Sequence, residues 1–213
     1  MLQGFTTMAD KYSNVDFDFI KAQEGFEKKG YVPNLKFEHH SGVTIASGFD
    51  LGQRDEKDLK GLPESLIEKF KPYLGLKLDK ASAKLKEMPL EVSLQEANIV
   101  NKFAKQKTLD ELSDQWKSAT GTDFDKLDKR KATVVASVAF QYGDLPTKTK
   151  NFWKQVTSDD WNAAYENLQN FGDKYNPRRQ REANYLNSFL LETHNKGKII
   201  DISTANTILK GYQ

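Results

Sequence analysis

One candidate for acid–base chemistry is Glu24, in the run Ala-Gln-Glu-Gly-Phe at residues 22–26. Phe19, Phe26 and Tyr31 lie nearby in the sequence, and an apolar setting of this kind suits a carboxyl group that acts as a general acid. A glutamate on the solvated face of a helix would have the same neighbours. Glu24 alone therefore leaves two interpretations open, an acid catalyst and an ordinary surface residue.

A second carboxylate, Asp50, follows Thr44 in the run Gly-Val-Thr-Ile-Ala-Ser-Gly-Phe-Asp-Leu-Gly at residues 42–52. Both side chains would leave the same face of a regular strand, but a fully extended chain would hold them roughly 20 Å apart. They can share a site only if the chain bends between them, and Ser47-Gly48 is where it could bend. A hairpin in which Thr44 is a strand former and Asp50 begins a turn is the alternative.

Three arginines, Arg178, Arg179 and Arg181, stand in the first turns of a predicted helix that Asn176-Pro177 would begin. Positive charge opposes the helix macrodipole at that end. This local conflict indicates that the cations are held for a carboxylate or a ligand, although long arginine side chains could also simply reach solvent.

The sequence offers no good metal or cofactor site. Without cysteine it has no thiolate ligand, disulfide or thiol nucleophile. His39-His40 lack the spacing of a metal-binding pair on a helix, and His194 is the remaining histidine. No phosphate-binding loop of the Gly-Lys-Ser/Thr type occurs, and no serine stands in a nucleophile-elbow context. We therefore expect no metal and no cofactor.

The 213 residues include 32 Lys plus Arg and 30 Asp plus Glu, which give a net charge of +2. Charges of both signs are interleaved along the chain, whereas a nucleic-acid-binding protein usually shows a clustered basic stripe. No apolar run approaches the length of a membrane span, and residues 1–10 lack the basic start and apolar stretch of a secretory signal. We therefore expect a folded monomer that binds no nucleic acid, does not insert stably into membranes and is delivered by another system.

The elements that must position these residues can be predicted from the hydrophobic pattern. Residues 16–29 suit a short helix, with Glu24 near its end. Residues 35–38 and 43–49, separated by Ser41-Gly42, form the strongest strand and hairpin signal. The rest of the pattern predicts helices at about 63–74, 79–87, 94–106, 108–118, 130–142, 147–156, 158–170 and 177–194.

Capping boxes mark two of the helix starts, Ser93 with Glu96 and Thr108 with Glu111. The predicted fold class is α+β, with a small β-hairpin lobe, a larger and mainly helical lobe, and a cleft between them. We expect three regions: an N-terminal extension or linker at 1–15, a folded domain at 16–195 and a C-terminal tail at 196–213.

Five motifs, in this order along the chain, resemble those of the phage lysozyme family, glycoside hydrolase family 24. The Glu-Gly at 24–25 is similar to that family's catalytic glutamate, and residues 44–48 resemble its Thr-Ile-Gly-x-Gly hairpin strand. The others are Phe-Gln-Tyr-Gly at 140–143, Trp-Asn-Ala-Ala at 161–164 and Arg-Arg-Gln-Arg-Glu at 178–182. The likeness spans about residues 18–190, and it implies a lysozyme-like catalytic domain at 16–195.

The resemblance also implies catalytic roles. Glu24 would protonate the leaving oxygen, while Asp50, with the Thr44 hydroxyl, would position and activate water on the other face of the sugar. The run at 42–52 is similar to that of the pesticin C-terminal domain and other bacterial toxin homologues of phage lysozyme, which place the aspartate after the threonine. The T-even phage pattern places it before, and Glu38 holds roughly that position as the rival of Asp50.

Two supporting roles follow from the same resemblance. Arg179 aligns with the family arginine that pairs with the catalytic glutamate. Gln141 stands where the family has a cleft-facing amide, which suits the binding of an N-acetyl sugar.

The implied activity is that of a peptidoglycan N-acetylmuramidase, which hydrolyses the β-1,4 bond between N-acetylmuramic acid and N-acetylglucosamine, with inversion favoured. It would act on glycan strands in the periplasm or cell wall, either as an antibacterial toxin or effector with a cognate immunity protein, or as a phage endolysin. A lytic transglycosylase and a catalytically silent peptidoglycan-binding module are the alternatives.

Overall fold

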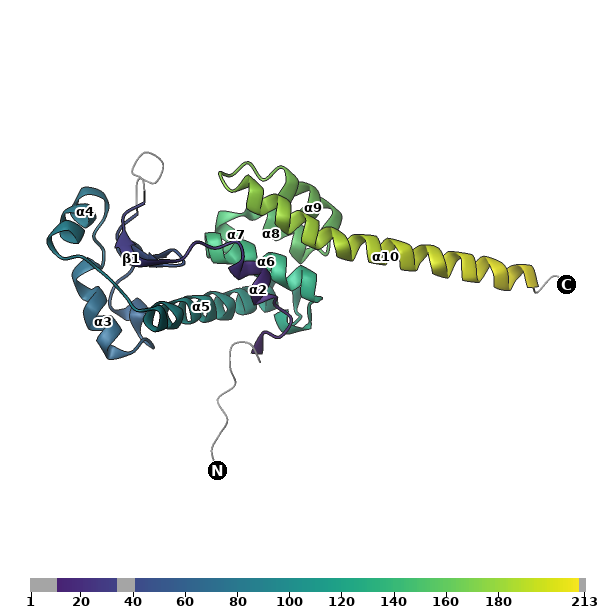
Figure 1. Cartoon of the computed structure of the whole chain (residues 1–213). Coiled ribbons are helices and arrows are strands. Elements are labelled where there is room, and N and C mark those ends of the chain that lie inside the picture. Colours follow the sequence, from purple (N-terminus) through teal and green to yellow (C-terminus); the bar gives the residue numbers. More distant parts are fainter. Residues whose placement is uncertain (1–10, 34–40, 211–213) are drawn as a thin grey trace, which may run out of the picture. The chain divides into compact units, whose positions relative to one another are not determined.

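The computed structural model describes residues 11–33 and 41–210 of the chain, with the burial of side chains up to His194. The chain divides into two compact units: Gln23–Lys107 form one, and Met1–Ala22 with Thr108–Gln213 form the other. We call them the sheet unit and the helical unit, because the first holds a three-stranded sheet and the second is built mainly from helices. Helices together with a small sheet confirm the predicted α+β class (Figure 1).

The sheet unit is organised around an antiparallel sheet in the order β1-β2-β3. Apolar side chains from β2 and its surroundings, among them Val43 and Ile45, share one buried core with residues of the neighbouring helices. The elements of this unit are β1 (Glu27–Tyr31), β2 (Thr44–Ala46), β3 (Phe49–Asp50), the 3-10 helices η1 (Leu51–Gln53), η2 (Lys57–Leu59) and η3 (Lys71–Tyr73), the helices α3 (Glu64–Phe70) and α4 (Leu78–Glu87), and the first part of α5 (Leu94–Thr120).

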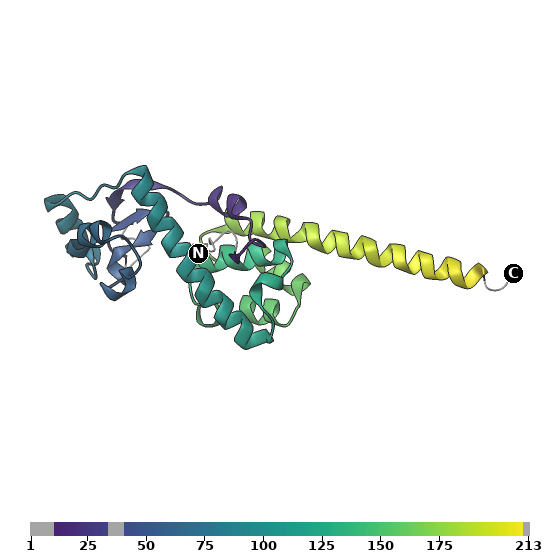
Figure 2. The ribbon, with the colours of Figure 1, turned by 90° about the horizontal axis from the view of Figure 1, so that it is seen from below.

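The helical unit is built around its helix α6 (Lys129–Tyr142), whose residues from Ala132 to Ala139 are all buried. Its other elements are α2 (Phe17–Lys21), residues 108–120 of α5, η4 (Phe124–Lys126), α7 (Leu145–Lys148), α8 (Lys150–Thr157), α9 (Trp161–Gln169) and α10 (Asn176–Lys210). The last helix packs along α9 and α6, and its C-terminal part runs on beyond them (Figure 2). None of the helices in the described part of the chain is long and apolar enough to cross a membrane.

Most of the predicted helices are present, and their ends differ by a few residues, except that the last one runs to Lys210 and not to residue 194. The pattern at 63–74 becomes α3 followed by η3, and the pattern at 147–156 is divided into α7 and α8 at Thr149. The capping box at the start of α5 is also confirmed. The Ser93 amide donates to the Glu96 carboxylate at 2.7 Å, and the Glu96 amide donates to the Ser93 hydroxyl at 3.1 Å.

The prediction of two helices at 94–106 and 108–118 is wrong, because α5 is one continuous helix. The second capping motif, at 108–111, lies inside it. Leu109 and Leu112 are buried in the core of the helical unit and continue the apolar stripe of α5. Packing of this stripe therefore keeps the chain helical through a motif that elsewhere begins a helix.

The prediction of a helix over 16–29 is wrong in its second half. The helix α2 ends at Lys21, and residues 27–31 form β1. Two backbone hydrogen bonds hold β1 in an extended conformation against a neighbouring segment: the Gly30 amide donates to the Leu90 carbonyl at 2.8 Å, and the Val92 amide donates to the Lys28 carbonyl at 2.9 Å. Glu24 therefore lies in the link between α2 and β1, not near a helix end.

Both ends of the expected domain carry more structure than the sequence indicated. Tyr12 belongs to the buried core of the helical unit, although it falls in the expected extension at 1–15. Its hydroxyl donates to Asp110 Oδ1 at 2.6 Å. At the other end α10 runs to Lys210, through most of the expected tail at 196–213. The expected strand at 35–38 lies outside the described residues.

Candidate active site

Strands β2 and β3 bring Thr44 and Asp50 together. The chain reverses at Ser47-Gly48, where Gly48 adopts a φ of +92°, a conformation that side chains with a Cβ rarely adopt. This reversal places Thr44 directly opposite Asp50 in the antiparallel register. The bend that the sequence required for a shared site is thus present, at the position where it was predicted.

The Asp50 carboxylate is fixed by backbone amides through one of its two oxygens. Oδ1 accepts hydrogen bonds from the Gly42 amide at 3.0 Å and from the Gly52 amide at 2.8 Å. Within the described residues, Oδ2 accepts no hydrogen bond. One oxygen therefore orients the carboxylate, and the other is available to a ligand or a water molecule.

Gly42 and Gly52 allow this arrangement because their backbones lie against each other. A Cβ on Gly42 would come within 2.2 Å of the Leu76 carbonyl oxygen, and a Cβ on Gly52 within 2.5 Å of the same atom. Only glycine fits at either position without a shift of the backbone. The two glycines at the ends of the 42–52 run thus bring the amides that hold Asp50 into place.

Thr44 and Arg54 complete the surroundings of Asp50. The Thr44 side chain is 3% exposed, and its hydroxyl donates to the Gly42 carbonyl at 3.3 Å. The Arg54 guanidinium donates to the Asp50 carbonyl and lies 3.9 Å from the centre of the Phe49 ring. Burial lowers the pKa of Arg54, although Asp50 and Asp58 act in the opposite direction.

Glu24 lies in the same unit and is held by an ion pair. Lys105 Nζ on α5 lies 2.7 Å from Glu24 Oε2, and the side chains of Lys105 and Glu24 are only 15% and 11% exposed. Glu24 Oε1 accepts no hydrogen bond from any described residue. The result is a mostly buried carboxyl group with one oxygen engaged by Lys105 and one oxygen available to a bound ligand.

Lys105 was not predicted as a site residue from the sequence. It is one of many lysines in the chain and lies on a helix far along the sequence from Glu24, so no spacing rule connects the two. Glu38, the rival of Asp50, lies outside the described residues, as do His39 and His40. No group of acidic residues and histidines within the described part of the chain could hold a metal ion.

Gln141 and Arg179 lie in the helical unit, on α6 and α10. Arg179 is fully buried and donates hydrogen bonds to Gln141 Oε1, to Glu182 Oε2 and, at 2.9 Å, to Asp173 Oδ2. The pairing of Arg179 with Glu24 that the resemblance implied stays a prediction. Within the helical unit, the buried guanidinium holds the amide of Gln141 and two carboxylates.

Arg178 extends this buried network. It donates to Glu182 Oε1 at 3.1 Å and to the carbonyl and hydroxyl oxygens of Ser137 at 2.9 and 3.0 Å. Ser137 in turn donates its hydroxyl hydrogen to Glu182. Two of the arginines that oppose the helix dipole are thus held by carboxylates, as one interpretation of the sequence proposed. Arg181 is exposed.

Asp173 joins the network to the surface. Burial by itself raises the pKa of Asp173, but hydrogen bonds from the Tyr142 hydroxyl, the Tyr175 amide and Arg179 outweigh burial and lower it below its usual value. The Tyr142 hydroxyl donates at 2.7 Å. Burial, with that hydrogen bond, raises the pKa of Tyr142 to about 12.

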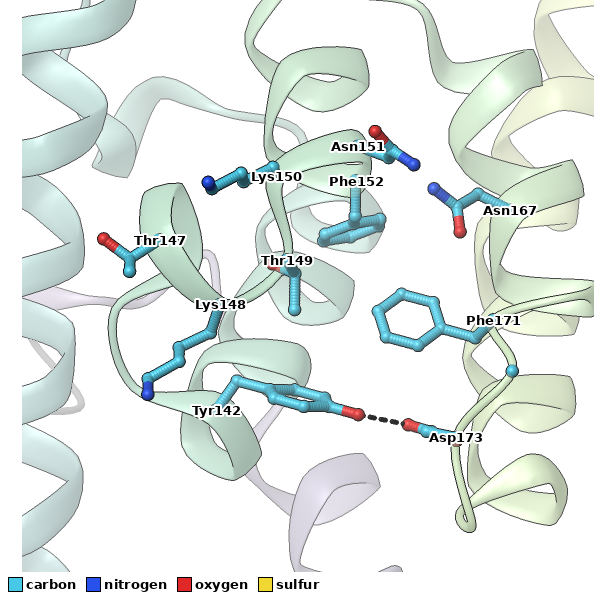
Figure 3. Close-up of a pocket in the computed structure, with 11 residues that line it drawn as sticks. Tyr142, Thr147, Lys148, Thr149, Lys150, Asn151, Phe152, Asn167, Phe171 and Asp173 are labelled. Atoms are coloured by element: carbon cyan, nitrogen blue, oxygen red, sulfur yellow. Dashed lines mark hydrogen bonds between the residues drawn. The ribbon is translucent and has the colours of Figure 1, made fainter.

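A pocket of about 530 Å³ opens beside Tyr142 and Asp173. Figure 3 shows the rings of Phe152 and Phe171 at the pocket and the side-chain amides of Asn151 and Asn167 near each other. The remaining lining residues are Tyr142, Thr147, Lys148, Thr149, Lys150, Gly172 and Asp173. Aromatic rings beside amides and ammonium groups are suited to a polar ligand. None of the lining residues was predicted as a site residue from the sequence; the predicted residue Gln141 precedes Tyr142 in the chain but does not line the pocket.

Comparison with protein families tests the resemblance directly. Residues 14–162 match the model of the family Pesticin, described as the bacterial toxin homologue of phage lysozyme, C-terminal. The match includes Glu24, Thr44, Asp50 and Gln141 and ends before Arg179. No curated protein matches the chain. Because the match covers more than half of the 213 residues, the chain belongs to the pesticin family of bacterial toxin homologues of phage lysozyme.

Proposed function

We propose that the chain is a peptidoglycan N-acetylmuramidase that cleaves the β-1,4 bond between N-acetylmuramic acid and N-acetylglucosamine. The observation that carries this proposal is the opposition of Thr44 and Asp50 across β2 and β3, in a chain that belongs to a family of phage lysozyme homologues. Glycosidic hydrolysis needs a proton donor on one side of the bond and a second carboxylate on the other. The sheet unit supplies candidates for both groups.

Glu24 is the proposed general acid. It would give its proton to the glycosidic oxygen as the bond to the anomeric carbon breaks, and the leaving sugar would depart as an alcohol. The ion pair with Lys105 engages Oε2, which leaves Oε1 to face the substrate.

Asp50 and Thr44 are the proposed water-positioning pair. Water would donate a hydrogen bond to Asp50 Oδ2, and a second to the Thr44 oxygen, whose own hydrogen is directed to the Gly42 carbonyl. The water oxygen would attack the anomeric carbon from the face opposite the leaving group, while Asp50 takes the proton. We propose inversion of configuration, which requires room for this water between the two carboxyl groups.

Gln141 is a proposed substrate-binding residue, and Arg179 supports it. Because Arg179 donates to Gln141 Oε1, the amide is oriented, and no described residue accepts a hydrogen bond from its Nε2. The Nε2 hydrogens would suit the carbonyl oxygen of an N-acetyl group. Tyr142, the residue after Gln141, lines the pocket in Figure 3, and this pocket would bind further polar parts of a glycan strand.

The products distinguish this function from its alternatives. We expect the purified chain to release muropeptides with reducing ends from isolated peptidoglycan, as measured by mass spectrometry. Anhydro-muramyl ends would identify a lytic transglycosylase, and binding without any release would identify a catalytically silent module. Thr44 opposite Asp50 favours hydrolysis, because a transglycosylase needs no water-positioning pair.

The biological setting that we propose is that of an antibacterial toxin or effector, since the matching family is one of bacterial toxins. The enzyme would act on peptidoglycan in the periplasm or cell wall after delivery by another system. The cell that makes it would need a cognate immunity protein.

Substitution by the matching amide separates Asp50 from its rival Glu38. We expect Asp50→Asn to lower kcat on purified peptidoglycan by about a hundredfold or more, since the amide is a poor base for the attacking water. Glu38→Gln should keep kcat within about twofold of the wild-type value. The reverse result, an active Asp50→Asn and an inactive Glu38→Gln, would move the role to Glu38.

A further inference from the structure

We propose that α5 fixes the positions of Glu24 and Asp50 relative to each other, with Lys105 and Asn101 as positioning residues. The inference rests on the proposed function, because it takes Glu24 as the acid and Asp50 as its partner. Neither residue of α5 was indicated by the sequence. Their role follows from the atoms that they contact in the sheet unit.

Lys105 positions Glu24. The glutamate lies in the link between α2 and β1, where no helix or strand hydrogen bonding fixes its backbone. Its side chain is nevertheless mostly buried, with Oε2 at 2.7 Å from Lys105 Nζ. The ion pair therefore supplies a fixed direction to a carboxyl group whose local backbone does not provide one.

Asn101 positions the hairpin that carries Thr44 and Asp50. Its side-chain oxygen Oδ1 accepts a hydrogen bond from the Ser47 amide at 3.0 Å, within the turn that joins β2 to β3. The Phe103 ring of α5 also meets the Phe49 ring of β3 edge-on, with 6.4 Å between the ring centres. The hairpin is thus attached to α5 both at its turn and along β3.

The spacing of the two positioning residues explains how one helix can serve both groups. Asn101 and Lys105 are four residues apart and so lie on the same face of α5, about one turn from each other. Ala97, one turn before Asn101, and Val100, next to Asn101, are fully buried in the core of the sheet unit and fix the helix there. The distance between acid and water-positioning groups is then set by a rigid helical turn.

The test is a comparison of kcat, KM and melting temperature on purified peptidoglycan. We expect Lys105→Met to lower kcat by about tenfold to a hundredfold with KM within about threefold of wild type, because a displaced acid slows the chemical step more than it weakens binding. Lys105→Arg should recover most of the lost kcat, since it can still donate to Glu24. A merely structural role would instead lower the melting temperature without a selective loss of kcat.

Lys102→Met is the matched control, because Lys102 lies on the same helix but is exposed. It should behave as wild type. If Lys105→Met lowers the melting temperature, the double variant Glu24→Gln/Lys105→Met measures whether that effect depends on the ion pair with Glu24. In the Glu24→Gln background, which lacks the ion pair, Lys105→Met should change the melting temperature by less than it does in the wild-type chain.

The results separate this inference from the proposed function. Inactive Glu24→Gln together with a Lys105→Met that keeps kcat within about twofold overturns the positioning role and leaves the function standing. Wild-type turnover that survives Glu24→Gln overturns the function itself. Equal losses in Lys105→Met and Lys105→Arg would also overturn the positioning role, because the arginine retains the charge and the donors.

Discussion

Glu24→Gln is expected to lower kcat on purified peptidoglycan by about a thousandfold, with little change in melting temperature. An amide cannot donate the proton that the leaving oxygen needs, and general acid catalysis contributes about 10² to 10⁴ in rate. Glutamine keeps an oxygen that can accept a hydrogen bond from Lys105, so the buried ammonium group is not left without an acceptor. Release of reducing ends and a thermal melt measure the two effects.

Glu27→Gln is the matched control for this experiment. Glu27 is also a glutamate, three residues along the chain, but it is exposed on β1. The same change of charge there should leave kcat within about twofold of wild type. If Glu24→Gln retains more than about a tenth of wild-type kcat, then Glu24 is not the general acid, and another carboxyl group must supply the proton.

The part of the site that could be predicted from the sequence is the part that depends on local rules. A glycine between two short runs of strand-forming residues is a local signal for a reversal, because glycine readily adopts a positive φ. The reversal at Ser47-Gly48 then fixes Thr44 opposite Asp50. Alternation of side chains in a strand was enough to anticipate which two residues would meet once the chain turned.

The conformation around Glu24 could not be predicted in the same way. Phe17, Phe19 and Ile20 suggested a helix that would continue through Glu24, and α2 does hold these three residues. The helix stops because the next segment gains its hydrogen bonds from residues 90 and 92, far away in the sequence. No pattern within residues 22–31 indicates that residues 90 and 92 would be their hydrogen-bond partners.

For the buried arginines, the sequence indicated that partners are needed but identified only some of them. Three cations at the start of a helix conflict with its dipole, and this conflict correctly indicated that partners were needed. Glu182, on the same helix, could be read from the i to i+3 and i+4 spacing to Arg179 and Arg178. Asp173 and Ser137 could not, because the fold and not the local sequence brings them near.

Arg179→Met is expected to cause the largest loss of stability among single substitutions in this network. Arg179 and Glu182 are both fully buried. Among the described residues, the methionine would leave Glu182 with Arg178 and Ser137 as partners, and Asp173 with Tyr142 and the Tyr175 amide. Removal of one member of a buried ion pair costs about 3 to 5 kcal/mol of unfolding free energy. In a chain of this size that corresponds to a melting temperature lower by roughly 6 to 20 °C.

The pH dependence of this loss distinguishes electrostatics from packing. The pKa of Asp173 is lowered in the folded state, so its contribution to stability is present above its unfolded pKa and is lost as the pH falls through the folded value. The gap in melting temperature between wild type and Arg179→Met should therefore narrow in acid, because protonation removes the charge that the variant leaves poorly paired. Arg181→Met, at an exposed position on the same helix, should shift the melting temperature by no more than a few degrees. A gap that stays constant down to acid pH would mean that the guanidinium acts by filling space, and that the charges of this network contribute little to the stability of the helical unit.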